Sequence, residues 1–195
     1  MANKNKKILI IAGPTGVGES TVTKELIARY PIFKRLVTAT TRSPRLKEKN
    51  KIDYYFFTEA QFKRRIADGR IIEYQNNRDG VYYGSYKPDL DKKLKQGFNI
   101  IMNPDIVGAK FYKKNYNATT IFLLPDSWAN LKKRHLLRNP DIKAQELKKR
   151  LAYAKSEIKN ESNFYDYKII NKQGELITTM EKIIKIIKKE GYRLK

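Results

Sequence analysis

The chain has 195 residues, no cysteine and a formal net charge of +22. This length suits one compact domain with small appended lobes, and the lack of cysteine excludes disulfides, zinc–thiolate sites and thiol nucleophiles. No apolar run is long enough to span a membrane or to form a signal peptide, so we expect a cytoplasmic protein without membrane contact. The positive charge attracts polyanions, but the lysines are spread along the chain and therefore select no particular partner.

The first predicted elements are a strand and a helix joined by a glycine-rich turn. Residues 7–12, KILIIA, are almost entirely apolar, which is typical of a strand buried on both faces of a parallel sheet. Residues 20–30 place Val22, Leu26 and Ile27 on one side of a predicted helix. A strand, a glycine-rich turn and a helix in this order are the context that a phosphate-binding loop requires.

The turn itself, GPTGVGEST, has the spacing of such a loop: glycine, four residues, glycine, lysine, then serine or threonine. Gly13, Gly18 and Ser20 match this pattern, whereas Glu19 stands at the lysine position. Backbone N–H groups of the loop bind phosphate oxygens at the start of a helix, and the Ser20 hydroxyl would bind Mg²⁺. The turn therefore predicts a nucleotide phosphate site.

A small sheet is predicted after the first helix. Residues 52–58 are aromatic and indicate a strand, and Thr58 and Gln61 have the spacing of a capping box at the start of a helix. Two short apolar runs flank Asp79-Gly80, which favours a hairpin.

The second half of the chain alternates strands with helices. Apolar runs predict strands at residues 98–102, 119–124 and 167–170, and helical spacing predicts helices at residues 127–138, 144–159 and 174–189. The last helix has an apolar stripe, for which core packing is favoured over membrane binding. Alternating strands and helices imply a layered α/β domain.

Further motifs follow the glycine loop in a fixed order. They are TTRSPR, the acidic residue of LKE, IDYYF, IIEY, YYGS and FLLPDSWANLKKR. This ordered set resembles the guanylate kinase family from Lys7 to about Ile187. The resemblance implies an α/β, three-layer P-loop NTPase fold with a central parallel sheet. It implies a core of residues 1–36, 97–125 and 160–195, an inserted GMP-binding lobe at 37–96 and a helical lid at 126–159.

The resemblance also implies roles for individual residues. The ATP site would consist of Gly13, Pro14, Thr15, Gly16, Val17, Gly18, Glu19, Ser20, Thr21 and Asn171, with Ser20 also reaching the metal. The GMP phosphate would be held by Arg42, Arg45, Tyr54 and Tyr83, with Glu48 in the same site, and the guanine base would lie near Thr38, Glu73, Ser85 and Asp105. The lid arginines that close over the phosphates during transfer would be Arg134, Arg138 and Arg150.

Physical arguments support several of these roles. Arginine forks bind phosphate bidentately, which suits Arg42 and Arg45. Guanine presents two adjacent donors that a carboxylate such as Glu73 accepts, whereas adenine offers an acceptor there, so the wrong base leaves the carboxylate unpaired. His135, the single histidine, matches no metal or base arrangement and is expected at the surface.

Glu19 departs from the family pattern, because the missing lysine contacts the β- and γ-phosphates. A like-charge contact at 4 Å costs about 4 kcal/mol at an effective dielectric of 20. Three interpretations remain open. Glu19 turns outward, where the helix dipole favours a carboxylate; or the chain is an inactive variant; or it is a degenerate homologue that still binds guanine nucleotide.

Asn103 is a second departure, since it replaces the first aspartate of an Asp-x-Asp pattern that organises Mg²⁺. The implied activity is phosphoryl transfer from ATP to GMP with Mg²⁺, and the implied partners are these small nucleotides, without a membrane or a specific nucleic acid, in a monomer or homodimer. The alternative is a catalytically weak or inactive nucleotide-binding or interaction module on the same fold. Nucleic-acid binding through the +22 charge is a weaker third hypothesis.

Overall fold

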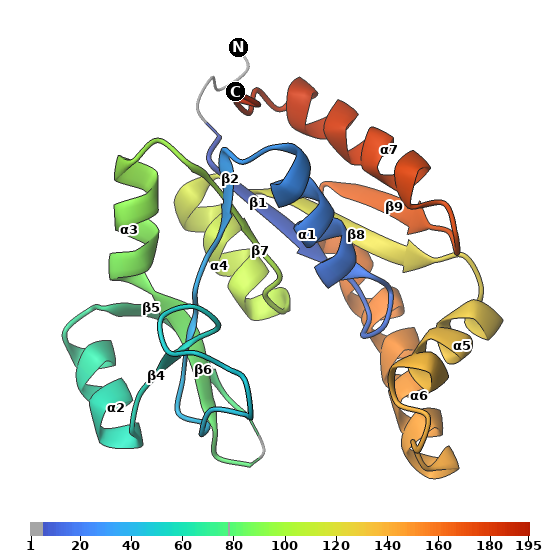
Figure 1. The fold of residues 1–195 in the computed structure, drawn as a ribbon, viewed down its shortest axis with the longest axis horizontal. Helices are drawn as coiled ribbons and strands as arrows, with labels where there is room; N and C mark the ends of the chain where they lie inside the picture. Colours follow the sequence, from blue (N-terminus) through green and yellow to red (C-terminus); the bar gives the residue numbers. More distant parts are fainter. Residues whose placement is uncertain (1–5, 78) are drawn as a thin grey trace. The chain divides into compact units, whose positions relative to one another are not determined.

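A computed structural model describes residues 6–77 and 79–195 of the chain (Figure 1). These residues form two compact units. The first contains the described residues up to Phe33 together with Ile101–Lys195, and the second is Lys34–Ile100. Residues 37–96, the expected GMP-binding lobe, all belong to the second unit, whereas residues 126–159, the expected lid, cluster with the first.

A parallel sheet forms the centre of the first unit. Strand β1 (Ile8–Ala12) pairs in parallel with β8 (Thr119–Pro125), which pairs in parallel with β9 (Tyr167–Asn171). The full strand order is β2-β7-β1-β8-β9, where β2 is Phe33–Arg35 and β7 is Asn99–Met102. Every residue of β1 is buried, as its apolar run predicts. The predicted α/β fold with a central parallel sheet is confirmed.

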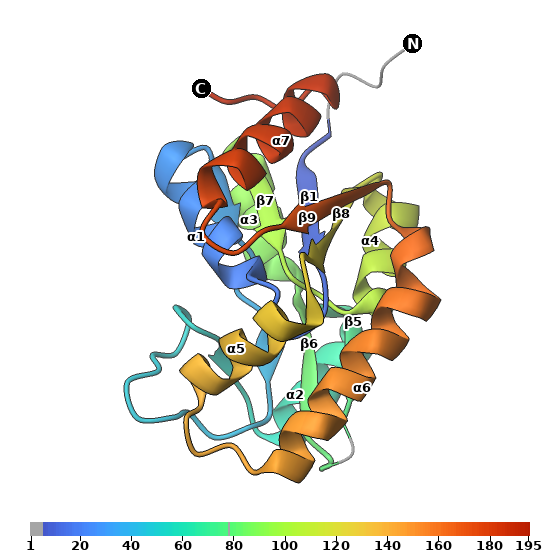
Figure 2. The same ribbon diagram turned by 90° about the vertical axis from the view of Figure 1, so that its right-hand side faces the viewer.

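Helices cover both faces of this sheet. Helices α1 (Glu19–Arg29) and α7 (Leu176–Lys189) lie on one face, and α4 (Ile106–Tyr116) and the C-terminal part of α6 (Ala144–Glu161) lie on the other (Figure 2). Helix α5 (Trp128–Arg138) follows β8, and a short 3₁₀ turn, η1 (Ser162–Phe164), joins α6 to β9. The result is a helix–sheet–helix arrangement of three layers.

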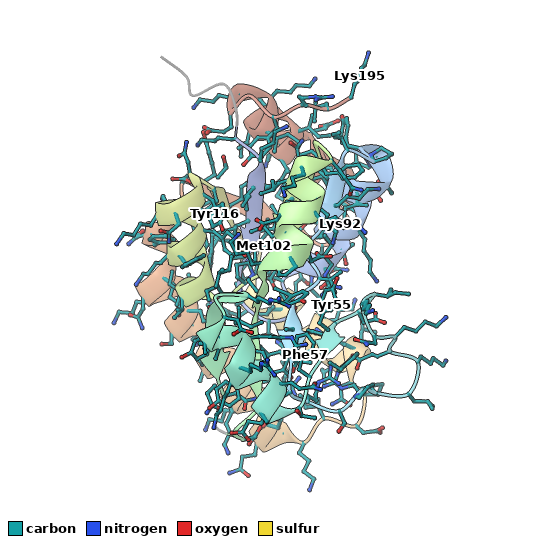
Figure 3. The ribbon with its side chains drawn as sticks, turned by 90° about the vertical axis from the view of Figure 1, so that its left-hand side faces the viewer. Tyr55, Phe57, Lys92, Met102, Tyr116 and Lys195 are labelled. Atoms are coloured by element: carbon teal, nitrogen blue, oxygen red, sulfur yellow. The ribbon has the colours of Figure 1, made fainter. Side chains whose placement is uncertain are left out.

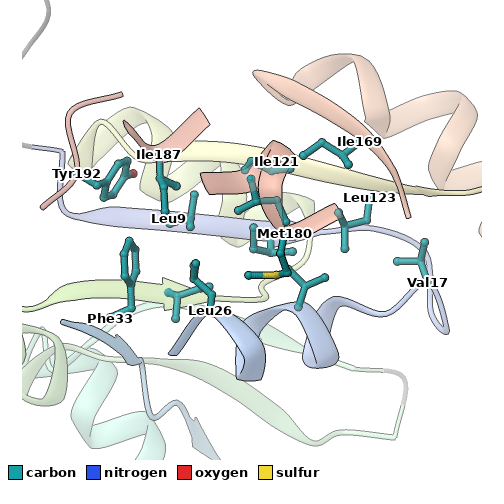
Figure 4. Close-up of a cluster of buried hydrophobic side chains, with 14 residues drawn as sticks. Leu9, Val17, Leu26, Phe33, Ile121, Leu123, Ile169, Met180, Ile187 and Tyr192 are labelled. Carbon is teal, nitrogen blue, oxygen red and sulfur yellow. The ribbon is translucent and has the colours of Figure 1, made fainter. Parts of the chain in front are cut away.

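The apolar stripe of α7 packs into the core, as expected. Met180, Ile183 and Ile187 are fully buried against Leu9 of β1 and Leu26 of α1 (Figure 4). Among the described residues, no helix combines the length and apolar character needed to cross a membrane.

The second unit has its own four-stranded sheet in the order β4-β3-β6-β5. The strands are β3 (Ala39–Thr40), β4 (Tyr55–Phe56), β5 (Ile71–Asn76) and β6 (Tyr82–Tyr86), and the helices are α2 (Glu59–Ala67) and α3 (Lys87–Lys95). The predicted hairpin is confirmed, because β5 and β6 pair antiparallel. The predicted capping box is also confirmed, with Thr58 and Gln61 exchanging hydrogen bonds at the start of α2. The rings of Tyr55 and Phe57 stack beside this sheet (Figure 3).

Two details differ from the sequence-based expectations. The predicted strand at residues 52–58 shrinks to β4, because Lys51 adopts a left-handed backbone with φ of 66° and Ile52 is 65% exposed. Helix α4 was not predicted. Its local signal is Asp105, whose side chain caps the helix by accepting hydrogen bonds from the backbone N–H groups of Val107 and Gly108.

Candidate active site

The glycine loop joins β1 to α1 in the first unit, and its shape depends on glycine. Gly16 and Gly18 have φ values of 89° and 108°, in the left-handed region. A Cβ atom at Gly16 would lie 3.1 Å from Nε2 of His135, and one at Gly18 would lie 2.6 Å from Nδ2 of Asn171. Both positions therefore need glycine for backbone conformation and for the close approach of a neighbouring side chain.

Two side chains from distant parts of the chain hold the loop. The Val17 carbonyl accepts hydrogen bonds from Nη1 of Arg134 at 2.6 Å and from Nδ2 of Asn171 at 2.8 Å. Arg134 also donates from Nη2 to the Asn171 carbonyl and from Nε to Gln173. Thr179 of α7 donates to Oδ1 of Asn171 and fixes that amide. Arg134 and Asn171 thus hold the backbone of the glycine loop through hydrogen bonds.

An open cavity of about 640 Å³ lies beside the loop. The lining residues from the loop and α1 are Gly16, Gly18, Glu19, Ser20, Thr21 and Lys24, and those from the opposite side are Arg134, Arg138, Asn171, Lys172, Gln173, Gly174 and Leu176. Most of the predicted ATP-binding residues therefore meet at one cavity, next to several cationic side chains and the N-terminus of a helix.

Glu19 does not turn outward, which excludes one of the three interpretations of this residue. Its side chain is half-buried, and its carboxyl group hydrogen-bonds to the backbone N–H of Gly13 within the loop. Burial and the nearby carboxylate of Glu157 raise the pKa of Glu19 to about 8. The full negative charge assumed in the sequence-based argument is therefore largely absent at neutral pH.

Glu157 of α6 belongs to the same acidic neighbourhood. Burial, followed by repulsion from Glu161, raises the pKa of Glu157 to about 7. Its Oε2 atom is buried and has no hydrogen-bond partner among the described residues. The pKa of Tyr165 is also raised, mainly by burial and then by Glu161 and Glu19. These groups share one region of low polarity, where ionisation of any one carboxyl opposes that of the others.

Asn103 makes structural hydrogen bonds. Its Nδ2 donates to the Ile11 carbonyl at 2.7 Å and lies 3.1 Å from Oγ1 of Thr23. An aspartate has no N–H to donate to Ile11. Asn103, which follows β7, is therefore linked to β1, the strand that precedes the loop.

His135 is not at the surface, so the expectation from the sequence was wrong. The residue is 2% exposed, on the buried side of α5 with Leu131, and its ring packs on Gly16. One feature of the sequence indicates this burial: His135 stands four residues after Leu131, which places both side chains on one face of a helix. A second cavity, of about 420 Å³, is lined by Thr15, His135, Arg138, Asn139 and Arg150.

The second unit brings together a different group of predicted residues. Oε2 and Oε1 of Glu48 accept hydrogen bonds from Nη1 and Nη2 of Arg42 at 2.8 and 2.9 Å, and Oε2 also accepts from the backbone N–H of Arg45. The guanidinium lies 5.3 Å from the centre of the Tyr54 ring, and Tyr83 hydrogen-bonds to it. Arg42 and the N–H of Arg45 lower the pKa of Glu48 to about 2. Arg42 is thus fixed in one orientation, and its buried Nε has no partner among the residues described.

Glu73 and Ser85 form a second pair in this unit. They face each other from β5 and β6, and the Ser85 hydroxyl donates to Oε1 of Glu73 at 2.7 Å. Ser85 is fully buried, whereas Glu73 and Thr38 are half-buried. Asp105, which was grouped with them, belongs to the first unit and caps α4 there.

Comparison with known proteins decides the family. The guanylate kinase family model matches residues 5–190. The chain belongs to the guanylate kinase family. It is 37% identical to guanylate kinase from Prochlorococcus marinus, over 94% of this chain and 97% of that protein. It is also 37% identical to guanylate kinase from Helicobacter pylori, over 99% of this chain and 92% of the relative. The crystal structure of guanylate kinase from Anaplasma phagocytophilum aligns with a TM-score of 0.70 and 26% identity, covering 98% of this chain and 89% of that one.

Guanylate kinases are ATP-dependent nucleoside monophosphate kinases. The residues near the loop fit a Mg²⁺ ion that arrives with ATP. Among the described residues, no group of three or more His, Asp or Glu side chains could hold a metal in advance. Mg²⁺ commonly takes phosphate oxygens and waters with few protein ligands, and the exposed Ser20 is suited to be one of them.

Proposed function

We propose that the chain transfers the terminal phosphoryl group of ATP to GMP, giving ADP and GDP. The observation that carries the proposal is the fixed Arg42 of the second unit. Its guanidinium is bound by Glu48, lies over Tyr54 and meets Tyr83, and its Nε remains without a partner among the described residues. Such a fixed fork suits a phosphate monoester, because little rotamer freedom remains to be lost on binding.

The Glu73–Ser85 pair supports guanine as the base. The hydroxyl of Ser85 already orients one carboxylate oxygen of Glu73, and a carboxylate accepts both neighbouring donors of guanine. Adenine presents an acceptor at the same place and would leave the carboxylate unpaired. We therefore propose that Glu73 sets the preference for GMP, with Thr38 and Asp105 as further proposed contacts.

Transfer needs no protein nucleophile. An oxygen of the GMP phosphate attacks the γ-phosphorus of ATP, the bond to the bridging oxygen breaks, and ADP leaves. Negative charge spreads over the oxygens of the transferred group, so the protein contributes mainly by position and by charge. The proposed parts are the loop backbone for the ATP phosphates, and Arg138 and Arg150 for charge neutralisation. Arg134 holds the loop and would reach the phosphates only by exchanging its present partners.

Mg²⁺ is proposed as the cofactor that arrives with ATP. The ion supplies positive charge to the phosphates when it is bound. Of this chain's residues, Ser20 would provide a hydroxyl ligand. Asn103 would keep the loop in place through Ile11 rather than contribute charge.

The test is ADP formation in a coupled assay with ATP and GMP, with AMP and CMP as alternative acceptors. We expect turnover that depends on GMP, with little from the other two. Glu73→Gln is the matched specificity variant, because it keeps the size of the side chain and turns one acceptor into a donor. It should reduce kcat/KM for GMP by about 100-fold or more. Equal rates with GMP and AMP in the unmodified chain would contradict the proposal.

A second candidate function is a nucleotide-binding module without turnover, favoured by Glu19 at the lysine position. This candidate predicts that GMP binds, as measured by calorimetry, while ADP formation stays at background. Glu19→Lys separates the two candidates, and Glu25→Lys on the same helix is its control for net charge. Turnover that appears only with Glu19→Lys would support the module.

A further inference from the structure

His135 is the buried polar side chain of the first unit that the proposed chemistry leaves unexplained. It is 2% exposed, and Nε2 has no hydrogen-bond partner among the described residues. The ring makes one polar contact of its own, a hydrogen bond to the backbone carbonyl of Thr15 in the loop. A buried ring nitrogen without a partner is costly, so its position suits a ligand that hydrogen-bonds to it.

The unpartnered nitrogen belongs to a residue that lines the cavity of about 420 Å³ beside the loop. The loop contributes Thr15 to this cavity, α5 contributes His135, Arg138 and Asn139, and α6 contributes Arg150. The described lining residues include two guanidinium groups and no carboxylate. Glu146 pairs with Nε of Arg150, but both side chains are more than a third exposed, so this pair contributes little. The composition suits a phosphate group.

The charged groups around His135 explain why an anion would change its protonation. Burial, followed by the positive charges of Arg150 and Arg138, lowers the pKa of His135, and the Thr15 carbonyl opposes this in part. The strand β8, which also packs against α5, has no titratable side chain. In the loop, the Glu19 carboxyl is bonded to Gly13. A phosphate in the cavity would offset both arginines and favour the imidazolium.

We propose that His135 takes up a proton from solvent when the phosphates of the donor nucleotide bind, and that its Nε2–H then donates to a phosphate oxygen. His135 thereby supplies the positive charge that the loop lacks at position 19. A neutral imidazole bonded to Thr15 through its other nitrogen presents a lone pair at Nε2, which repels phosphate, whereas the imidazolium presents a donor. This inference rests on the proposed function, because it assigns one more residue to the ATP site.

The test uses the fact that His135 is the only histidine in the chain. Its ring C–H signal in a ¹H–¹³C NMR spectrum is therefore assigned without variants. The signal is followed from pH 5 to 8.5 with and without saturating inorganic tripolyphosphate, while the backbone amides of Gly16 and Gly18 report whether the loop is occupied. We expect the midpoint of the His135 titration to rise by about one pH unit or more with tripolyphosphate.

Calorimetry with the same probe gives a second readout. By linkage, the affinity of the unmodified chain should fall severalfold between pH 6 and pH 8, because a rise of about one pH unit in the midpoint limits the change to about tenfold. Phosphate itself titrates near pH 6, so His135→Gln serves as the matched control, because its amide donates a hydrogen bond but does not titrate in this range. The variant should show only the pH dependence of the probe. Circular dichroism and the loop amide signals check that it is folded.

Two outcomes would overturn the inference, and they differ in what else they affect. If the loop amides respond to tripolyphosphate while the His135 midpoint stays fixed, the ATP site stands and the role of His135 is wrong. If neither responds, the proposed ATP site fails and the inference fails with it.

Discussion

At the scale of single residues, the site is organised by a few side chains that fix others. Glu48 holds Arg42 through two oxygens, and Asn171 and Arg134 hold the loop through the Val17 carbonyl. Glu19 stands where the loop pattern has lysine, yet it bonds within the loop at Gly13. The loop therefore keeps its backbone shape without the lysine, and any missing charge has to come from another residue.

Glu19→Lys and His135→Gln should be coupled. If His135 supplies the cation near the phosphates, its loss should lower kcat/KM for ATP about tenfold in the unmodified chain. In the Glu19→Lys background, where lysine provides that charge, the loss should be threefold or less. The four proteins form a double-mutant cycle, measured by steady-state kinetics with saturating GMP. Equal losses in both backgrounds would show that the residues act independently.

Glu157→Gln should change stability in a way that depends on pH. The folded pKa of Glu157 is raised to about 7 from an ordinary 4.5. The contribution of Glu157 to the free energy of unfolding is therefore fully present below pH 4.5. It is lost as pH rises from 4.5 through 7, because the buried side chain must then ionise. Glutamine imitates the neutral form. Because the side chain is partly exposed, we expect a gain of about 1 kcal/mol at pH 8 and none at pH 4.

For a chain of this size, that gain corresponds to a Tm higher by about 2–4 °C at pH 8. Thermal unfolding monitored by circular dichroism at both pH values checks it. Glu181→Gln, on the exposed side of α7, controls for the removal of one carboxylate. A Tm difference that is the same at pH 4 and pH 8 would contradict the raised pKa.

At the scale of helices and strands, most residues of the candidate site lie at the ends of these elements. The loop lies between β1 and α1, Asn103 follows β7, and Asp105 caps α4. Arg138 is the last residue of α5, the helix that packs His135 against the loop. Strand ends and helix termini supply unpaired backbone groups, which is why binding groups gather there.

Asp105 provides a test of one helix end, because capping α4 and recognising guanine require different properties of its side chain. Asp105→Ala should lower the free energy of unfolding by about 1 kcal/mol, through loss of the bonds to Val107 and Gly108. Asp105→Asn should keep the cap. If Asp105 also contacts guanine, as the family resemblance implies, both variants raise KM for GMP. If it only caps α4, Asp105→Asn behaves like the unmodified chain in denaturation and in kinetics.

Elements with a strong local pattern could be predicted from the sequence, and those defined by tertiary contacts could not. The loop, the capping box of α2 and the apolar stripe of α7 each have a recognisable pattern within one short segment of the sequence. Strand β2 has three residues and β3 has two, so their existence depends on neighbouring strands. The spacing of His135 from Leu131 is a weak local signal of burial, but the contact of its ring with Gly16, more than a hundred residues away, depends on the tertiary fold. Asn103 departs from the family's Asp-x-Asp pattern, and its hydrogen bond to Ile11 depends on the strand order, which the sequence does not show.

At the scale of the whole molecule, the formal charge of +22 predicts nonspecific attraction to polyanions. We expect binding to a labelled DNA duplex to weaken by about a thousandfold or more between 50 and 200 mM salt, with the same steepness for unrelated sequences. Fluorescence anisotropy at several salt concentrations measures the slope. A preference for one sequence, or binding that persists at high salt, would require a dedicated nucleic-acid site.

A chain with glutamate at position 19 should still work as a guanylate kinase. The most direct measurement is ADP formation by the unmodified protein with ATP, Mg²⁺ and GMP at neutral pH. We expect turnover that requires GMP and that neither AMP nor CMP supports in its place. Background rates in the unmodified protein, together with GMP binding by calorimetry and turnover restored by Glu19→Lys, would contradict it and leave a nucleotide-binding module.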